Sequence, residues 1–270
     1  MSDYAVQCIT APNAGVMTGN GTNSYLLGNG SVLIDPGPAN AEHIERLIAA
    51  ADGRLQYVLV THTHLDHSPA AKAVAADTGA VVVGLPAPIA ANQDVAFVPA
   101  LLPQHDEILE LADLRIRAIH TPGHASNHVC YLDMQSGLLF TGDHINQGTT
   151  VVIPPPDGSM RHYIASLELL KNYPVQAIAP GHGSIIHEPL RAIESLIRHR
   201  LQREAKTFTR LSTLGAAGPV ALEPLLVSVY DDVPVALHPV ARLSLLAHLE
   251  KLVADERVIK VAQGPAWIVA

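Results

Sequence analysis

The sequence has 270 residues, a net charge of −8 at neutral pH and a pI near 6.0. Hydrophobic residues make up 48% and charged residues 16%, a composition typical of a folded globular chain and not of a disordered one. The acidic balance and the aromatic content of only 4% count against a protein that works mainly by neutralising phosphates or stacking bases. Fifteen histidines stand out, because histidine is the commonest metal ligand and carries protons near neutral pH.

The cysteine content and the apolar runs bear on the compartment. Two cysteines, Cys8 and Cys130, are too few for a disulfide framework. No signal-peptide pattern opens the chain, and no apolar run reaches the roughly 18 to 20 residues that a membrane span needs. We therefore expect a soluble, cytoplasmic protein that has no membrane partner.

Short apolar strands alternate with helices through the first two thirds of the chain. The first part predicts strands at 24–27, 31–34, 57–60 and 80–83, and helices at 40–51 and 68–78, the second of them ending at Gly79. A proline-rich, irregular segment follows at 85–103. Further strands are expected at 114–119, 129–132, 138–140 and 177–179, with a helix at 160–172. This alternation indicates an α/β fold.

The composition changes after about residue 190. Residues 191–270 carry ten Lys or Arg against eight Asp or Glu, about +2, which leaves about −10 for residues 1–190. This tail predicts helices at 192–214, 221–229 and 240–254 and a small hairpin at 257–261 and 266–269. The pattern suggests a winged-helix-like unit, although its amphipathicity would equally suit a helical lid. We therefore expect two domains, 1–190 and 191–270.

Seven histidines and aspartates that could bind metal follow the predicted strands. Four lie in one loop directly after the strand at 57–60, and three lie in later turns marked by glycine: His62, His64, Asp66, His67, His124, Asp143 and His182. A catalytic zinc needs about three protein ligands and an open position. Seven ligands therefore suit two metals that share one carboxylate.

These patterns resemble the metallo-β-lactamase superfamily. The resemblance rests on the HxHxDH pattern at 62–67, the Gly-Asp turn at 142–143, the Pro-Gly-His-Gly turn at 180–183 and the segments 22–26 and 33–37. The ligand set is similar to that of glyoxalase II and unlike that of the zinc β-lactamases, which use a cysteine at the second metal. The tail resembles the C-terminal winged-helix-like domain of the β-lactamase-like protein 2 group. The resemblance implies an αββα sandwich followed by a small winged-helix-like domain.

The resemblance also implies two sets of metal ligands that share one residue. One metal would be held by His62, His64 and His124, the other by Asp66, His67 and His182, and Asp143 would bridge them. Zinc is the expected metal, at two ions per chain, and the same ligands also accept Fe or Mn. A metal-bound hydroxide would attack the substrate. Asp66 and Asp143 are the expected catalytic residues, since Asp66 can orient that hydroxide as well as bind metal.

Several neighbouring residues are candidates for supporting roles. Asp35 is expected to hydrogen-bond a metal-binding histidine, with an ordinary β-turn role as the alternative. Residues 144–150 are expected to line the substrate groove. The candidates for protonating the leaving group or binding substrate are His144, Asn146 and His162 with Tyr163. His128 is expected to hydrogen-bond within the fold, and His199 is a weaker candidate for facing the groove.

The leading functional prediction is a binuclear zinc hydrolase that acts on an ester or thioester of a small acyl substrate. The apolar, proline-rich segment 151–156 near the expected metals would suit an acyl chain. The alternative is an endoribonuclease or phosphodiesterase, because a winged helix often contacts nucleic acid, although the slight basic excess of the tail weakens it. A third interpretation is a non-catalytic module whose tail mediates dimer contacts. The sequence is compatible with a monomer or a homo-oligomer.

Overall fold

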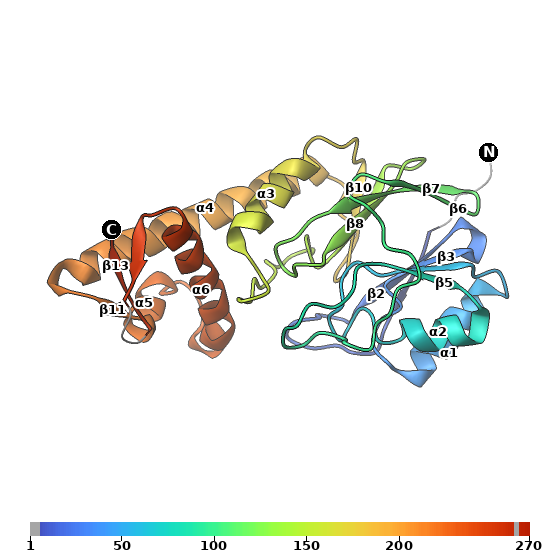
Figure 1. Ribbon diagram of the computed structural model, residues 1–270, viewed down its shortest axis with the longest axis horizontal. Coiled ribbons are helices and arrows are strands. Elements are labelled where there is room, and N and C mark those ends of the chain that lie inside the picture. Colours follow the sequence, from blue (N-terminus) through green and yellow to red (C-terminus); the bar gives the residue numbers. More distant parts are fainter. Residues whose placement is uncertain (1–5, 262–264) are drawn as a thin grey trace.

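The computed structural model describes residues 6–261 and 265–270, and two five-stranded sheets form its larger part (Figure 1). The first sheet contains, in spatial order, β1 (Gln7–Thr10), β2 (Asn23–Leu27), β3 (Val32–Ile34), β4 (Tyr57–Leu59) and β5 (Val81–Val83). The second contains β10 (Ala177–Pro180), β9 (Leu138–Gly142), β8 (Val129–Asp133), β7 (Leu114–His120) and β6 (Ile108–Leu111). Strands β3, β4 and β5 are parallel, as are β9 and β10, and the remaining pairs of these two sheets are antiparallel.

The two sheets pack face to face over a shared apolar core. Tyr25 of β2 and Phe140 of β9 are buried there, with their rings edge to face and the ring centroids 5.2 Å apart. Helices α1 (Ala41–Ala51) and α2 (Ala71–Thr78) cover the outer face of the first sheet. Helix α3 (Met160–Leu170) and the start of α4 (Pro189–Leu214) cover the second. The predicted αββα sandwich is confirmed.

Local sequence signals explain where the first two helices begin and end. Asn40 caps α1, because its side chain accepts a hydrogen bond from the His43 backbone N–H at 2.9 Å. Gly79 ends α2 with a left-handed φ of +75°, which glycine adopts without steric cost. Both ends agree with the sequence prediction. Where a helix or strand was predicted, the observed one begins and ends within three residues of the predicted range.

The C-terminal part has its own core. It contains α4, α5 (Leu222–Val229) and α6 (His238–Ala254), together with a sheet in the order β11 (Val220–Ala221), β13 (Ala266–Val269) and β12 (Val258–Lys260). Two one-turn 3-10 helices, η2 (Gly215–Ala217) and η3 (Val235–Leu237), also belong to this part, and η1 (Gly28–Gly30) lies between β2 and β3 of the first sheet. Leu211, Leu225, Leu245 and Trp267 are buried together in this core. Three helices with a small sheet are the arrangement expected of a winged helix. The alternative, a lid built only of helices, does not account for the sheet.

Helix α4 connects the two parts and is 26 residues long (Figure 1). Its first turns pack on α3, and its later turns contact α5, α6 and β13. The division of the chain at residue 190 stays a prediction, because α4 begins at Pro189 and contributes to both cores. In residues 6–261 and 265–270, no helix has the length and apolar character needed to cross a membrane.

Candidate metal centre and groove

The seven candidate ligands come together where strands of both sheets end. His62 to His67 follow β4, His124 follows β7, Asp143 follows β9 and His182 follows β10. The described part of the chain contains two groups whose donor atoms lie within 4.8 Å of one another: His62, His64 and His124, and Asp66, His67, Asp143 and His182. The groups match the two sets that the resemblance implies. Metal binding by them stays a prediction.

Three imidazole nitrogens converge in the first group. His64 Nδ1 lies 3.0 Å from His62 Nε2 and 2.9 Å from His124 Nε2. Burial lowers the pKa of His62 well below its ordinary value and that of His64 to about 3, with the neighbouring histidines adding to the effect. The rings of His62 and His64 are therefore neutral near pH 7. Three imidazole nitrogens that face one point suit a cation such as Zn²⁺, whose bonds to histidine nitrogen are about 2.0 to 2.1 Å long.

Two nitrogens and two carboxylates converge in the second group. His182 Nε2 lies 3.3 Å from Asp66 Oδ2 and 3.2 Å from Asp143 Oδ1. His67 Nε2 lies 3.5 Å from an oxygen of each carboxylate, and it is buried without a hydrogen-bond partner. A buried, unpartnered nitrogen beside carboxylate oxygens is the donor arrangement that a cation would complete.

Asp143 lies between the two groups. Its Oδ2 is 3.5 Å from His124 Nε2 of the first group, and its Oδ1 is 3.2 Å from His182 Nε2 of the second. Asn146 holds this carboxylate, because its Nδ2 donates to Asp143 Oδ1 at 3.0 Å while its Oδ1 accepts from the His182 backbone N–H at 3.1 Å. The position is the one expected of a bridging ligand.

The charges of the second group also favour a cation. Burial alone would raise the pKa of Asp143, but His67 and His182 hold it well below its usual value. Burial alone would lower the pKa of His182, yet Asp143 and Asp66 raise it to about 9. The carboxylates are therefore ionised and attract positive charge to this position. A divalent cation can supply that charge in place of protons on the histidines.

Hydrogen bonds on the far side of the rings fix which nitrogen faces the centre. Nδ1 of His67 donates to Asp35 Oδ2 at 2.9 Å, Nδ1 of His124 to the Val152 carbonyl at 2.6 Å and Nδ1 of His182 to the Gly21 carbonyl at 3.0 Å. Each bond turns Nε2 toward the other ligands, and a neutral ring held in this way keeps its proton on Nδ1 and leaves Nε2 for a metal, as metal-binding histidines require. The contact predicted for Asp35 is present.

Two glycines let the backbone approach this crowded centre. Gly142 has a φ of +43°, and a Cβ atom there would lie 2.3 Å from Thr61 Oγ1. A Cβ atom at Gly181 would lie 2.8 Å from His67 Cε1. Any larger residue at either position would move a neighbour of the ligands.

The two groups open into a groove of about 920 Å³. His64, Asp66, His124 and Asp143 line one part of it. Apolar residues line much of the rest, from the 151–156 segment and from the C-terminal part: Val151, Val152, Pro154, Tyr230, Val240 and Ala241. A groove of this size can enclose a small molecule, and its apolar walls suit a hydrophobic group.

The structure divides the predicted groove residues. Asn146, Thr149, Thr150 and His199 line the groove. His144 does not, which corrects its expected place at substrate: it is fully buried, and its ring packs on that of Tyr163 at a centroid distance of 4.9 Å. A residue next to a ligand can turn to either side of the backbone, and this one turns into the core.

The other candidate proton donors are also placed elsewhere. Tyr163 is fully buried and donates to the His144 carbonyl at 3.0 Å. His162 is exposed on α3 and does not line the groove. His128 is buried with its Nδ1 2.9 Å from Thr121 Oγ1, so its predicted role within the fold is confirmed. Expectations of substrate contact at His162 and Tyr163 were therefore wrong.

Sequence reasoning missed Arg200, Arg203 and Tyr230 as groove residues. The only signal was helical spacing, because Arg200 and Arg203 are three residues apart and so share a face of α4. Arg203 donates to both carboxylate oxygens of Asp232, at 2.8 and 2.9 Å, and its guanidinium lies 4.4 Å from the centroid of the Tyr230 ring.

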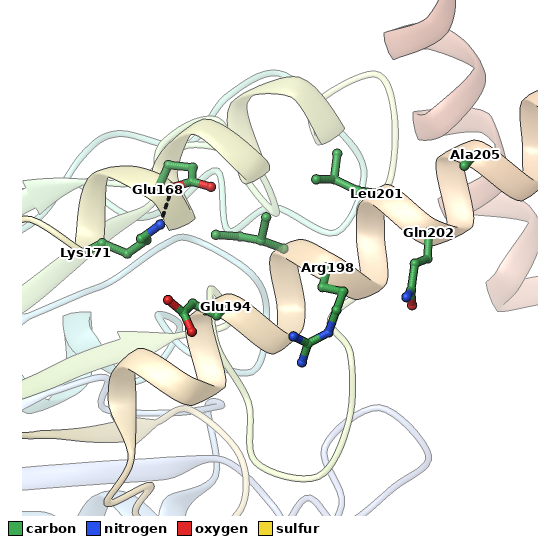
Figure 2. A pocket seen from close by; sticks show the side chains of 8 residues that line it. Glu168, Lys171, Glu194, Arg198, Leu201, Gln202 and Ala205 are labelled. Atoms are coloured by element: carbon green, nitrogen blue, oxygen red, sulfur yellow. Dashed lines mark hydrogen bonds and ion pairs between the residues drawn. The ribbon is translucent and has the colours of Figure 1, made fainter.

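A second depression, of about 420 Å³, lies between α3 and α4 (Figure 2). Glu168, Lys171, Glu194 and Arg198 line it, and Lys171 Nζ donates to Glu168 at 2.9 Å. It shares no lining residue with the groove and has no histidine in its lining. The candidate site is therefore the groove, and the two hollows lie on different sides of α4.

Comparison with known protein families divides the chain into the same sandwich part and C-terminal part. Residues 17–182 match the metallo-β-lactamase superfamily, and residues 223–267 match the β-lactamase-associated winged helix domain. The chain is 32% identical to a β-lactamase-like protein 2 homolog of Drosophila melanogaster, over 89% of this chain and 85% of that protein. It is 30% identical to an atrochrysone carboxyl ACP thioesterase of Aspergillus chevalieri, over 96% and 86%.

A solved structure has the same fold over nearly the whole chain. It is that of a metallo-β-lactamase family protein from Thermus thermophilus, with a TM-score of 0.79 and 19% identity, covering 98% of each chain. Both the sandwich and the C-terminal unit are therefore shared.

Proposed function

Since the chain belongs to the metallo-β-lactamase superfamily, we propose that it is a metal-dependent hydrolase that cleaves thioesters of acyl substrates. The observation that carries the proposal is the groove, where two groups of metal-ligand side chains adjoin apolar walls. The proposal has three parts: the metals, the reaction and the substrate.

The metal part assigns two zinc ions to the two groups. The donor sets fit, since one offers three imidazoles and the other two imidazoles and two carboxylates, and both accept Zn²⁺, with Fe or Mn as alternatives. Asp143 is the proposed bridge. When bound, such ions lower the pKa of a water and polarise an acyl oxygen, which supplies the nucleophile and the electrophilic assistance of hydrolysis.

Other side chains of the protein orient the attacking water and fix the metal ligands in place. Asp66 reaches the groove with its side chain 27% exposed, so its carboxylate can orient an attacking water as well as bind metal. Asn146 fixes Asp143, and Asp35 fixes His67. The apolar walls exclude bulk water from the acyl group, which strengthens electrostatic interactions at the reacting carbon.

A thioester suits this groove better than an oxygen ester. Its thiolate leaving group has an ordinary pKa of about 8.5 and departs without a strong need for a proton donor. His144 and Tyr163, which were candidates for that donor, are buried outside the groove. The relative that is named as an acyl-carrier-protein thioesterase supports the same substrate class.

The alternative of a nuclease loses support from the charges of the tail. Seven of its ten basic residues form ion pairs with carboxylates: Arg191, Arg203, Lys206, Arg210, Arg242, Lys251 and Arg257. Basic side chains that are already paired offer little charge to phosphates. The surface of the C-terminal part therefore favours a small acyl substrate over RNA.

The test is a substrate panel. Metal-loaded enzyme is incubated with acyl thioesters of increasing chain length and, separately, with labelled single-stranded RNA, and Asp143→Ala controls for contaminating activity. We expect thioester cleavage that the variant lacks. RNA cleavage that the variant lacks, with thioesters untouched, would overturn the proposal and move the protein to the nucleases.

A further inference from the structure

We infer that Arg200, on helix α4, is a positioning residue for the metal centre and acts on His124 through the backbone of Val151 and Val152. The inference rests on the metal site of the proposed function but is independent of the substrate. It assigns a role at the centre to a helix that also belongs to the C-terminal part.

The contact runs through two consecutive carbonyl groups. Arg200 Nη2 donates to the Val151 carbonyl at 2.5 Å. The next carbonyl, that of Val152, accepts from His124 Nδ1 at 2.6 Å. The two carbonyls belong to successive planar peptide units that share the Cα of Val152, so a shift of the first unit displaces that atom and with it the second carbonyl. Arg200 thereby helps to set the orientation of the His124 ring, whose Nε2 faces His64.

A second contact of the same guanidinium reaches the other side of the centre. It lies 5.3 Å from the centroid of the Tyr163 ring, and Tyr163 Oη donates to the His144 carbonyl at 3.0 Å. His144 directly follows Asp143, the proposed bridge. One side chain of α4 therefore contacts residues that hold both His124 and the backbone beside Asp143.

The charge of Arg200 supports a specific role. The side chain is only 2% exposed, and within residues 6–261 and 265–270 it forms no ion pair with a carboxylate. On the same helix, Arg203 and Lys206 both pair with Asp232. Burying an unpaired cation costs folding free energy. If the side chain at this position served only to fill space in the core, an apolar residue would be more stable there. Here the cation serves the Val151 carbonyl and the Tyr163 ring.

A purely structural role would give a different result from a positioning role. If Arg200 only attached α4 to the sandwich, its loss would lower stability and leave the affinity for metal unchanged. If it orients His124, its loss weakens one of two metal sites in protein that is still folded. Partners of this kind outside the ligands typically change metal affinity by 10- to 100-fold.

The experiment measures zinc affinity of the full chain by competition with a chelator, and the visible spectrum after replacement with Co²⁺. Arg200→Met is compared with wild type and with Arg198→Met, a control on the same helix whose exposed side chain lines the other depression. We expect Arg200→Met to weaken one site about tenfold and to change the Co²⁺ spectrum. Arg198→Met should do neither. Arg200→Lys, which returns a cationic donor, should restore most of the affinity.

Equal affinity and equal spectra for wild type and Arg200→Met would overturn the inference. If Arg200→Met does not fold, Arg200→Gln takes its place under the same criteria, because it is also neutral and too short to make both contacts. A wild-type chain that binds fewer than two metals would overturn the proposed function, and this inference with it. The two failures are therefore distinguishable.

Discussion

Asp35 and His67 are joined by a buried hydrogen bond of 2.9 Å between Oδ2 and Nδ1. Two further bonds hold the carboxylate, since the backbone N–H and the hydroxyl of Thr61 each donate to it at 2.8 Å. Asp35 also has a left-handed φ of +50°, which asparagine tolerates better than most residues. The charge at this position can therefore be removed by asparagine with little strain in the backbone.

The first prediction follows from this contact. Asp35→Asn should weaken the metal site of Asp66, His67 and His182 by about 10- to 100-fold, because a neutral amide no longer fixes the His67 ring with the proton on Nδ1. Zinc titration against a chelator measures the change. Asp113→Asn, an exposed substitution, is the control. Unchanged affinity in Asp35→Asn would show that the contact is only structural.

The second prediction concerns the length of the acyl group. Val240 lines the groove from α6 and is only partly buried, so a phenylalanine there narrows the groove without being forced into the core. Val240→Phe should raise KM for long acyl thioesters about tenfold, equivalent to about 1.4 kcal/mol, and leave acetyl thioester almost unchanged. Steady-state kinetics across a series of chain lengths measures this.

Val227→Phe is the matched control for that experiment. Val227 is 60% exposed on α5 and does not line the groove. Its replacement should leave every substrate unaffected. An equal effect of both substitutions, or an effect of Val240→Phe that does not depend on chain length, would contradict the groove as the acyl site.

The third prediction concerns the pH dependence of stability. Glu204 accepts a hydrogen bond from Lys251 Nζ at 3.0 Å. Burial alone would raise the pKa of Glu204, but His248 and Lys251 outweigh it and lower the pKa below its usual value. A depressed carboxylate pKa contributes stability above the unfolded pKa of about 4.3, and that stability is lost as pH falls through the folded pKa.

Glu204→Gln should therefore be less stable than wild type by about 1 to 3 kcal/mol at pH 7, and the difference should shrink below about pH 4.3. Urea unfolding at several pH values measures the free energy of unfolding of both. Glu223→Gln is the control, because Glu223 forms a mostly exposed ion pair with Arg242. A difference that stays constant down to pH 3 would contradict the ion-pair account.

The fourth prediction concerns removal of metal. A metal that binds only the folded chain stabilises it, so a chelator should lower Tm, and added zinc should restore it. At a free zinc concentration 100 times Kd, each bound ion adds about 2.7 kcal/mol to stability. Calorimetry with and without chelator measures the shift. A Tm that does not respond to either addition would show that these side chains hold no metal.

The sequence predicted which histidines and aspartates come together because their signals are local. Short β-branched strands end in glycine turns, and the carboxyl ends of β4, β9 and β10 meet, so histidines and aspartates after them are brought together. Strands β1, β6 and β11 were missed, because β11 has only two residues and polar residues stand within the four-residue runs of β1 and β6. A pairing partner from elsewhere in the chain makes them strands.

Side-chain direction in turns and contacts between distant segments could not be read from the sequence. His144 follows a predicted ligand, yet it faces the core because Tyr163 provides a packing surface there. Arg200 reaches Val151 across 49 positions of the chain, and only the packing of α4 on the sandwich creates that contact. Groove walls depend on such tertiary contacts, which is why Tyr230 and Arg203 were not predicted.

The measurement that tests the central claim most directly is the metal content of wild type and Asp143→Ala, determined by elemental analysis after loading and dialysis. The account predicts two ions per chain in wild type, fewer in Asp143→Ala, and loss of thioester hydrolysis in the variant. Two tightly held ions in the variant, or full hydrolysis by it, would contradict a centre in which Asp143 joins two metals.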